Sequence, residues 1–180
     1  MYGFQNEDFL KTLNGAVAQI GEINRIADKV SDLGYKNIYL VGTGGTYAII
    51  SPLAYMLKTN STLAWYHEIA AELLAAKPRS LTRDSLFITA SLSGTTKETI
   101  AAAEYARSMG ATVISFVGDR TAPLAAVSDY VVENAACNDN LVEELHIQFF
   151  ALGASLMLRN GELPQYERFA ETLRAMPEAL

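Results

Sequence analysis

The feature that most constrains this chain is an apolar run that leads directly into a hydroxyl-rich turn and a helix-forming stretch. Residues 86–90 are Leu-Phe-Ile-Thr-Ala, a pattern typical of a strand buried on both faces. Residues 91–96 are Ser-Leu-Ser-Gly-Thr-Thr, and residues 97–109 are rich in helix formers. Thr95, with Glu98 three positions later, predicts a capping box at the start of that helix. The sequence therefore predicts a strand, a turn and a helix in one unit.

A turn of this kind can bind an anion. The first backbone N–H groups of a helix lack partners within the helix, and the helix dipole adds partial positive charge at that end. The hydroxyls of Ser91, Ser93, Thr95 and Thr96 can supply further donors. Because the turn contains no Lys or Arg, neutral groups would hold a bound phosphate. A capped turn with no ligand remains the alternative, since such turns are common in α/β proteins.

Composition restricts the class of protein. A chain of 180 residues, half of them hydrophobic, is suited to one domain with a sizeable core. The net charge of −6 and the lack of a basic run argue against a nucleic-acid partner. Cys137 is the single cysteine, so no internal disulfide can form, and we expect a cytoplasmic protein. The start of the sequence has no signal-peptide pattern. The longest apolar run of the whole sequence, residues 149–158, is too short to span a membrane.

The remaining elements follow from hydrophobic spacing. Apolar residues at helical intervals predict one long helix over residues 6–33. Further strands are predicted at 37–41, 61–66, 112–117 and 129–132, helices at 47–58, 69–76, 141–159 and 163–176, and a helical turn at 124–127. His67 and Glu68 are expected to open the helix that follows them, and Asn140 to cap the helix over 141–159. Strands that alternate with helices predict a three-layer αβα sandwich with a five-stranded parallel sheet.

A second strand–turn–helix unit contains Gly-Thr-Gly-Gly-Thr at residues 42–46. Glycines allow backbone N–H groups to approach an anion closely. Gly42 and Gly44 also match two positions of the dinucleotide fingerprint G-x-G-x-x-G, with Glu68 at a suitable distance. Tyr47 occupies the third position, where a large side chain obstructs close packing of helix and strand. Dinucleotide binding is therefore a weak alternative.

Both turns lie at the carboxyl ends of predicted strands. If the first and third strands are neighbours, as in the flavodoxin-like order, the two turns meet at one ligand site. Glu143 and Glu144 are consecutive on a helix, so they point about 100° apart and do not form an acid/base pair. Glu143 and His146 lack a third ligand, so no metal site is predicted.

The two turns together resemble the sugar isomerase (SIS) domain family. The first carries Thr43-Gly44-Gly45-Thr46-Tyr47 and the second Ser91-Leu92-Ser93-Gly94-Thr95-Thr96. Glu68, the Thr121–Ala125 segment and Glu144 also match, and the resemblance covers residues 25–160. Within this family, the chain most resembles the amino-terminal half of fructosamine-6-phosphate deglycases and the isomerase part of glucosamine-6-phosphate synthase.

The resemblance implies a flavodoxin-like domain that binds a hexose 6-phosphate or fructosamine 6-phosphate without a cofactor or metal. It assigns phosphate binding to Gly44, Gly45, Thr46, Ser91, Ser93, Thr95 and Thr96. Thr43 and Glu144 would contact the sugar, and Glu144 is also the candidate catalytic residue. Leu92 departs from the glutamine of the synthases, so one side-chain contact is expected to be lost.

The family's reactions are proton transfer between C1 and C2 of an open-chain sugar and cleavage of a C–N bond. In its tandem enzymes the catalytic Glu and His come from a second domain or a neighbouring subunit. We expect an N-terminal helix over 1–34, the SIS domain over 35–160, and a C-terminal helix over 161–180 that resembles the linker to a second domain. This chain alone would then bind phosphosugar and turn over little.

Two further expectations concern partners. The apolar faces of the first helix and of residues 147–158 exceed what one small sheet can cover, which predicts a homodimer. A non-catalytic phosphosugar sensor of a regulator is the alternative function. No DNA-binding motif or basic patch precedes residue 37, which argues against a self-contained repressor.

Overall fold

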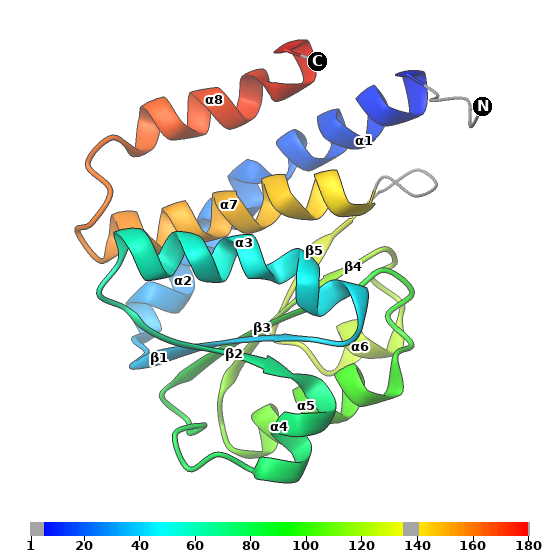
Figure 1. Cartoon of the computed structure of the whole chain (residues 1–180), viewed down its shortest axis with the longest axis vertical. Helices are drawn as coiled ribbons and strands as arrows, with labels where there is room; N and C mark the ends of the chain where they lie inside the picture. Colours follow the sequence, from blue (N-terminus) through cyan, green and yellow to red (C-terminus); the bar gives the residue numbers. More distant parts are fainter. Residues whose placement is uncertain (1–5, 135–140, 180) are drawn as a thin grey trace.

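The computed structural model describes residues 6–134 and 141–179 of the chain. Its centre is a parallel sheet of five strands in the order β2-β1-β3-β4-β5 (Figure 1). The strands are β1 (Asn37–Gly42), β2 (Ala64–Ile69), β3 (Ser85–Ser91), β4 (Thr112–Val117) and β5 (Tyr130–Glu133). The first and third strands are neighbours, so the predicted flavodoxin-like order is confirmed.

Helices cover both faces of the sheet, which confirms the three-layer αβα sandwich. They are α1 (Asn6–Ala18), α2 (Ile20–Leu33), α3 (Gly45–Asn60), α4 (Ala70–Ala76), α5 (Lys97–Ser108), α6 (Pro123–Ala126), α7 (Leu141–Arg159) and α8 (Tyr166–Ala179). In Figure 1, α4, α5 and α6 lie on one face, and α2, α3 and α7 lie on the other. Helices α1 and α8 pack against α7 and against each other on the outer side of that second layer.

Strand β3 is the centre of the core, because all seven of its residues are buried. Its side chains alternate between the two faces, as the pleat of a strand requires. Leu86 and Ile88 pack into the apolar cluster beneath α2, α3 and α7. Phe87 packs into the separate cluster beneath α4 and α5. An apolar run without alternation is the pattern expected of a strand that supplies two cores at once.

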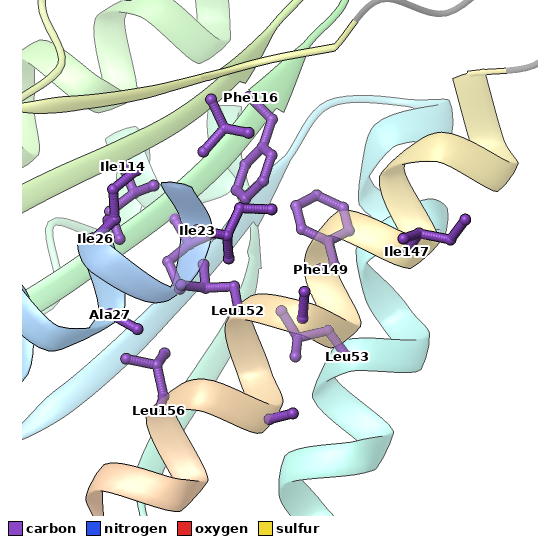
Figure 2. Packing of buried hydrophobic residues seen from close by; sticks show 14 of the residues in the cluster. Ile23, Ile26, Ala27, Leu53, Ile114, Phe116, Ile147, Phe149, Leu152 and Leu156 are labelled. Carbon is purple, nitrogen blue, oxygen red and sulfur yellow. The ribbon is translucent and has the colours of Figure 1, made fainter. Parts of the chain in front are cut away.

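Helix α7 spans the predicted residues 141–159 and is buried along most of its length. It packs against α1, α2, α3 and α8 of the same chain. Figure 2 shows its side chains interdigitating with those of α2 and α3, and the rings of Phe149 and Phe116 meet edge to face with centroids 4.8 Å apart. The apolar surface of α7 is thus covered by helices of the same chain, and its burial does not require a second copy of the protein. The homodimer stays a prediction.

The predicted single helix over residues 6–33 is wrong, because two helices, α1 and α2, occupy this stretch. They are separated at Gln19, whose N–H bonds the carbonyl of Ala16 at 3.1 Å, the shorter spacing of a turn. The break lets α1 pack on α7 and α8 while α2 reaches β5. The last helix is also displaced from its predicted bounds, since α8 begins at Tyr166 and includes Pro177.

The second strand begins three residues later than predicted, at Ala64. Ser61 and Thr62 were expected in the strand, but they form a loop that binds the carboxylate of Glu162. The Ser61 hydroxyl donates to Glu162 Oε2 at 2.5 Å, and the Thr62 N–H donates to Oε1 at 2.6 Å. His67 and Glu68 consequently fall inside β2, so the prediction that they open a helix is wrong.

No helix within the two described ranges is long and apolar enough to cross a membrane. Strand β4 has its predicted bounds, and β5 lies at one edge of the sheet. Cys137 and the predicted cap Asn140 lie outside the described residues.

Candidate functional site

The two predicted turns meet at the carboxyl edge of the sheet. Strands β1 and β3 are paired in register, with Val41 opposite Thr89, so both turns leave neighbouring strands at the same level. The Thr89 hydroxyl donates to the carbonyl of Val41 at 2.8 Å and ties the strand ends together. Beyond the strands, the hydroxyl of Thr43 in the first turn lies 3.0 Å from the hydroxyl of Thr99 in α5. The predicted convergence of the two turns is confirmed by these contacts.

The first turn is compact because Gly42 carries no side chain. A Cβ atom at Gly42 would lie 2.5 Å from the backbone nitrogen of Tyr47 and 2.6 Å from its Cα. Helix α3 can therefore begin immediately beside the end of β1. Gly44 is the N-cap of α3, and the N–H of Thr46 bonds the carbonyl of Thr43 at 3.2 Å. The amino end of a 16-residue helix thus faces the carboxyl edge of the sheet.

The hydroxyl groups of the second turn form hydrogen bonds with one another. Ser91 Oγ and Thr96 Oγ1 are 3.0 Å apart, and the Gly94 N–H donates to Ser91 Oγ at 3.2 Å. Ser93 Oγ accepts from the Thr95 hydroxyl at 3.0 Å and from the Thr95 N–H at 3.3 Å. Ser93 and Thr95 are exposed, whereas Ser91 is buried. The turn therefore presents several hydroxyls near the start of α5.

The predicted capping box of Thr95 and Glu98 is wrong. Helix α5 begins at Lys97, its N-cap is Thr96, and no side chain caps it. The Thr95 hydroxyl is directed into the turn, where it donates to Ser93, so it does not serve the helix. Both α3 and α5 thus begin at this edge without a side-chain cap, which leaves their amino ends available to an anion.

A third segment supports the second turn from the side of β4. Gly94 has a φ of +61°, and a Cβ atom there would lie 2.3 Å from Cβ of Ala122, so only glycine fits. The Leu124 N–H donates to the carbonyl of Gly94 at 3.0 Å, and the Gly118 N–H donates to that of Leu92 at 2.9 Å. These contacts fix the second turn against the loop that follows β4.

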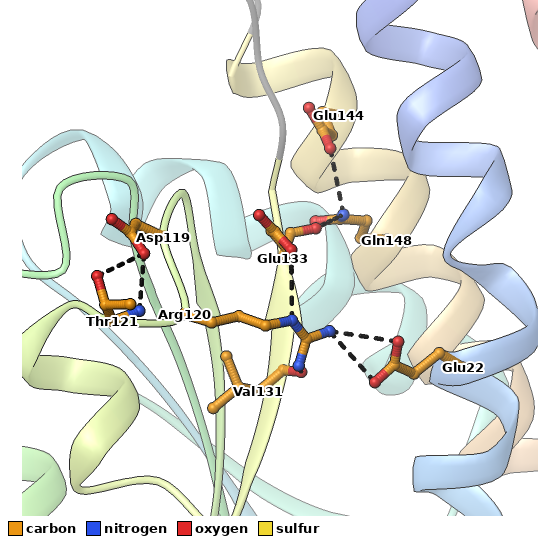
Figure 3. Close-up of polar contacts among 8 residues, drawn as sticks. All are labelled: Glu22, Asp119, Arg120, Thr121, Val131, Glu133, Glu144 and Gln148. Carbon is orange, nitrogen blue, oxygen red and sulfur yellow. Dashed lines mark hydrogen bonds and ion pairs between the residues drawn. The ribbon is translucent and has the colours of Figure 1, made fainter.

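The side chain of Arg120 anchors the loop that follows β4 (Figure 3). Its Nη1 donates to the carbonyl of Val131 in β5 at 3.0 Å, and its Nε lies 3.3 Å from Oε2 of Glu133. Its Nη2 reaches both carboxylate oxygens of Glu22 in α2 at 3.3 Å. One guanidinium therefore joins the loop beside the site to a strand and a helix.

His67 contacts the first turn from β2. Its ring stacks on the ring of Tyr47, with centroids 4.0 Å apart and planes 12° apart, and its Nε2 lies 3.0 Å from the Tyr47 carbonyl. Burial lowers the pKa of His67, and the hydrogen bond to Tyr47 opposes this only in part. Tyr47 fills the position where a dinucleotide fingerprint needs a small residue, so this turn does not match the fingerprint.

Glu144 lies in a buried polar cluster at the start of α7 (Figure 3). Its side chain is fully buried, and Gln148 Nε2 lies 3.4 Å from its Oε1. Gln148 also donates to the carbonyl of Glu133 at 2.9 Å and accepts from Asn134 at 3.4 Å. This carboxylate is therefore not open to solvent in the present structure. The predicted role of Glu144 toward a sugar stays a prediction.

Other features lie away from the two turns. A cavity of about 530 Å³ lies between α3, α7 and α8, and its lining, which includes Met56, Phe150 and Phe169, contains no residue of either turn. Among residues 6–134 and 141–179, no group of three or more His, Cys, Asp or Glu side chains is placed to hold a metal ion. The sequence pattern did not identify three residues that hold the site together, namely Thr89, Thr99 and Arg120.

Comparison with known proteins gives a consistent result. The sequence model of the SIS domain matches residues 34–158. Fructosamine deglycase FrlB of Bacillus subtilis (strain 168) is 34% identical over 98 residues, which are 54% of this chain and 30% of FrlB. A candidate phosphosugar isomerase from Salmonella typhimurium LT2 superposes with a TM-score of 0.80 at 25% identity, covering 88% of this chain and 49% of that chain.

The C-terminal domain of glucosamine-fructose-6-phosphate aminotransferase from Francisella tularensis superposes with a TM-score of 0.79 at 14% identity. The superposition covers 95% of this chain and 53% of that chain, and at this identity it concerns the fold alone. The chain thus spans about half the length of these two structures. With its sheet order, its two converging turns and the match over residues 34–158, the chain belongs to the SIS domain family.

Proposed function

We propose that this chain binds a sugar phosphate, with the phosphate held between the first turn (residues 43–46) and the second turn (residues 91–96). The observation that carries the proposal is the contact of Thr43 in the first turn with Thr99 in α5, beside the paired carboxyl ends of β1 and β3. Ligands of open parallel sheets bind at this edge. The proposed phosphate ligands are Gly44, Gly45, Thr46, Ser91, Ser93, Thr95 and Thr96.

The chemistry of the turns suits a phosphate dianion. Helices α3 and α5 both begin at this edge, so their dipoles favour negative charge there. The hydroxyls of Ser93 and Thr96 can rotate. Ser93 accepts from Thr95, so its own proton can be donated to a phosphate oxygen, and Thr96 can donate to phosphate in place of its contact with Ser91. Hydrogen bonds to a charged acceptor are roughly twice as strong as neutral ones. Neutral donors in sufficient number can therefore hold the dianion.

The proposed activity is that of a sugar-phosphate isomerase or of a fructosamine- or glucosamine-6-phosphate deglycase. Membership of the SIS family and the similarity to FrlB support this class. Both reactions need a base near neutrality that moves a proton at C1 or C2 of the open-chain sugar. Glu144 is the candidate within this chain, and it must become accessible to act. The chain alone therefore supplies phosphate binding and little turnover.

Titration calorimetry tests the binding proposal directly. Fructose 6-phosphate and glucosamine 6-phosphate should bind, whereas fructose and NAD should not. The double variant Ser93→Ala with Thr96→Ala should weaken phosphosugar binding by about 2–4 kcal/mol, because two charge-assisted hydrogen bonds are lost. Ser108→Ala, at the far end of α5, is the matched control and should bind as the parent chain does. Unchanged affinity in the double variant would remove the phosphate site from these turns.

A further inference from the structure

We propose that His67 is a positioning residue that holds the first turn in the orientation needed to receive phosphate. This inference rests on the proposed function of the two turns. His67 lies in the edge strand β2, and strand alternation places its side chain with Trp65 on the α3 face of the sheet. There its Nε2 lies 3.0 Å from the Tyr47 carbonyl, and its ring stacks on the Tyr47 ring.

Tyr47 is constrained from two sides. The backbone nitrogen and Cα of Tyr47 lie where a side chain at position 42 would be, so Tyr47 cannot move closer to β1. The imidazole of His67 fixes its carbonyl and ring from β2. A displacement of Tyr47 would carry Thr46 with it, because the two share a peptide bond. The orientation of the α3 amino end therefore depends on the contact between His67 and Tyr47.

The hydrogen bond defines what His67 can do. A carbonyl oxygen only accepts, so Nε2 must carry the proton and donate it. The lowered pKa of His67 favours the neutral ring near pH 7, so the imidazole does not act as a cation toward phosphate. Its effect is transmitted through Tyr47. A residue that merely fills space would contribute its ring alone, whereas a positioning residue also needs its donor.

Two substitutions separate the ring from the donor. His67→Phe retains the stacking ring and removes the donor, whereas His67→Gln retains an amide donor and removes the ring. We expect His67→Phe to weaken fructose 6-phosphate binding about fivefold to tenfold in calorimetry, the value of one hydrogen bond. His67→Gln should restore affinity to within about threefold of the parent chain. His146→Phe, at the other histidine, on α7 and outside both turns, should leave affinity unchanged.

Thermal unfolding and amide hydrogen exchange of the same variants complete the test. His67→Phe should accelerate exchange at the start of α3, and His67→Gln should reverse this. If the parent chain binds phosphosugar and His67→Phe binds equally well, the role of His67 is overturned and the proposed function stands. If both substitutions lower stability and affinity alike, His67 is structural and the inference fails. If the parent chain binds no sugar phosphate, the proposed function itself fails.

Discussion

The hydroxyl of Thr43 lies 3.0 Å from the hydroxyl of Thr99, and this contact joins the first turn to the helix that follows the second. The two residues are 56 positions apart and come from different strand–turn–helix units. Thr99 is buried and Thr43 is partly exposed, so the contact is partly shielded from water. The spacing of the two helix starts across the site therefore depends on a hydrogen bond between two side chains.

We expect Thr99→Val to lower the free energy of unfolding by about 1 kcal/mol, because it removes this bond while keeping the shape of the side chain. Phosphosugar affinity should fall as well, since the first turn loses its direct link to α5. Urea unfolding and calorimetry measure the two effects. Thr172→Val, which removes only a local bond to the Arg168 carbonyl within α8, serves as the control and should leave affinity unchanged.

Gly42, at the end of β1, and Gly45, in the first turn, should respond differently to the same substitution. Gly42→Ala places a methyl group 2.5 Å from the Tyr47 nitrogen, so the backbone must shift. We expect a loss of about 1–3 kcal/mol in the free energy of unfolding, the usual cost of overpacking, together with weaker phosphosugar binding. Gly45→Ala meets no atom within 4 Å and should fold normally. Equal stability of both variants would contradict the close approach of β1 and α3.

Glu162 should make stability dependent on acid. Partial burial raises the pKa of this carboxyl, but hydrogen bonds from Ser61 and Thr62 outweigh it and lower the pKa from 4.5 to about 2. A depressed pKa means that the ionised form stabilises the fold above pH 4.5, and that this contribution is lost as the pH falls toward 2. Glu162→Gln should therefore be less stable than the parent chain at pH 6.

The measurement is urea unfolding across this pH range. The stability difference between the parent chain and Glu162→Gln should shrink steadily as the pH falls from 4.5 toward 2. Glu171→Gln, at an exposed position of α8, is the control and should follow the parent chain. A stability difference that is independent of pH would refute the link between Glu162 and the loop before β2.

Arg120 should contribute modestly and in a salt-dependent way. Its side chain is 44% exposed, and ion pairs in water contribute little because solvent screens them. We expect Arg120→Ala to lower the free energy of unfolding by about 1 kcal/mol at low ionic strength. The difference should decrease in about 0.5 M salt, where the Debye length is only a few ångströms. An effect that does not change with salt would assign the stabilisation to the bond with the Val131 carbonyl.

The strands and the two turns that follow β1 and β3 could be predicted because their signals are local. Strand β4 and helix α7 have their predicted bounds, since each is a continuous pattern that nearby residues begin and end. Parallel strands place every strand-to-helix turn at one edge of the sheet, so chain order predicted that both turns lie there. Their convergence depended in addition on the flavodoxin-like order, in which β1 and β3 are neighbours.

The errors occur where distant contacts decide the structure. Ser61 and Thr62 have strand-like residue types, but a carboxylate 100 residues away along the chain holds them in a loop. His67 follows a short apolar run and looked like a helix start, yet pairing of β2 with β1 keeps it extended. Thr95 matched a capping box in sequence, but its hydroxyl donates to Ser93. The sequence pattern describes what a segment can form, and its partners select among the possibilities.

The burial of α7 between α1, α2, α3 and α8 determines when the protein can become stable during its synthesis. The hydroxyl of Ser155 donates to Asn24 Oδ1 at 2.8 Å, so residues 131 positions apart in the sequence meet within the same layer. A nascent chain that has not yet released α7 from the ribosome leaves the apolar sides of α2 and α3 without their cover. Such contacts between distant segments slow folding, and the growing polypeptide remains exposed to aggregation and chaperone capture until α7 has been synthesised.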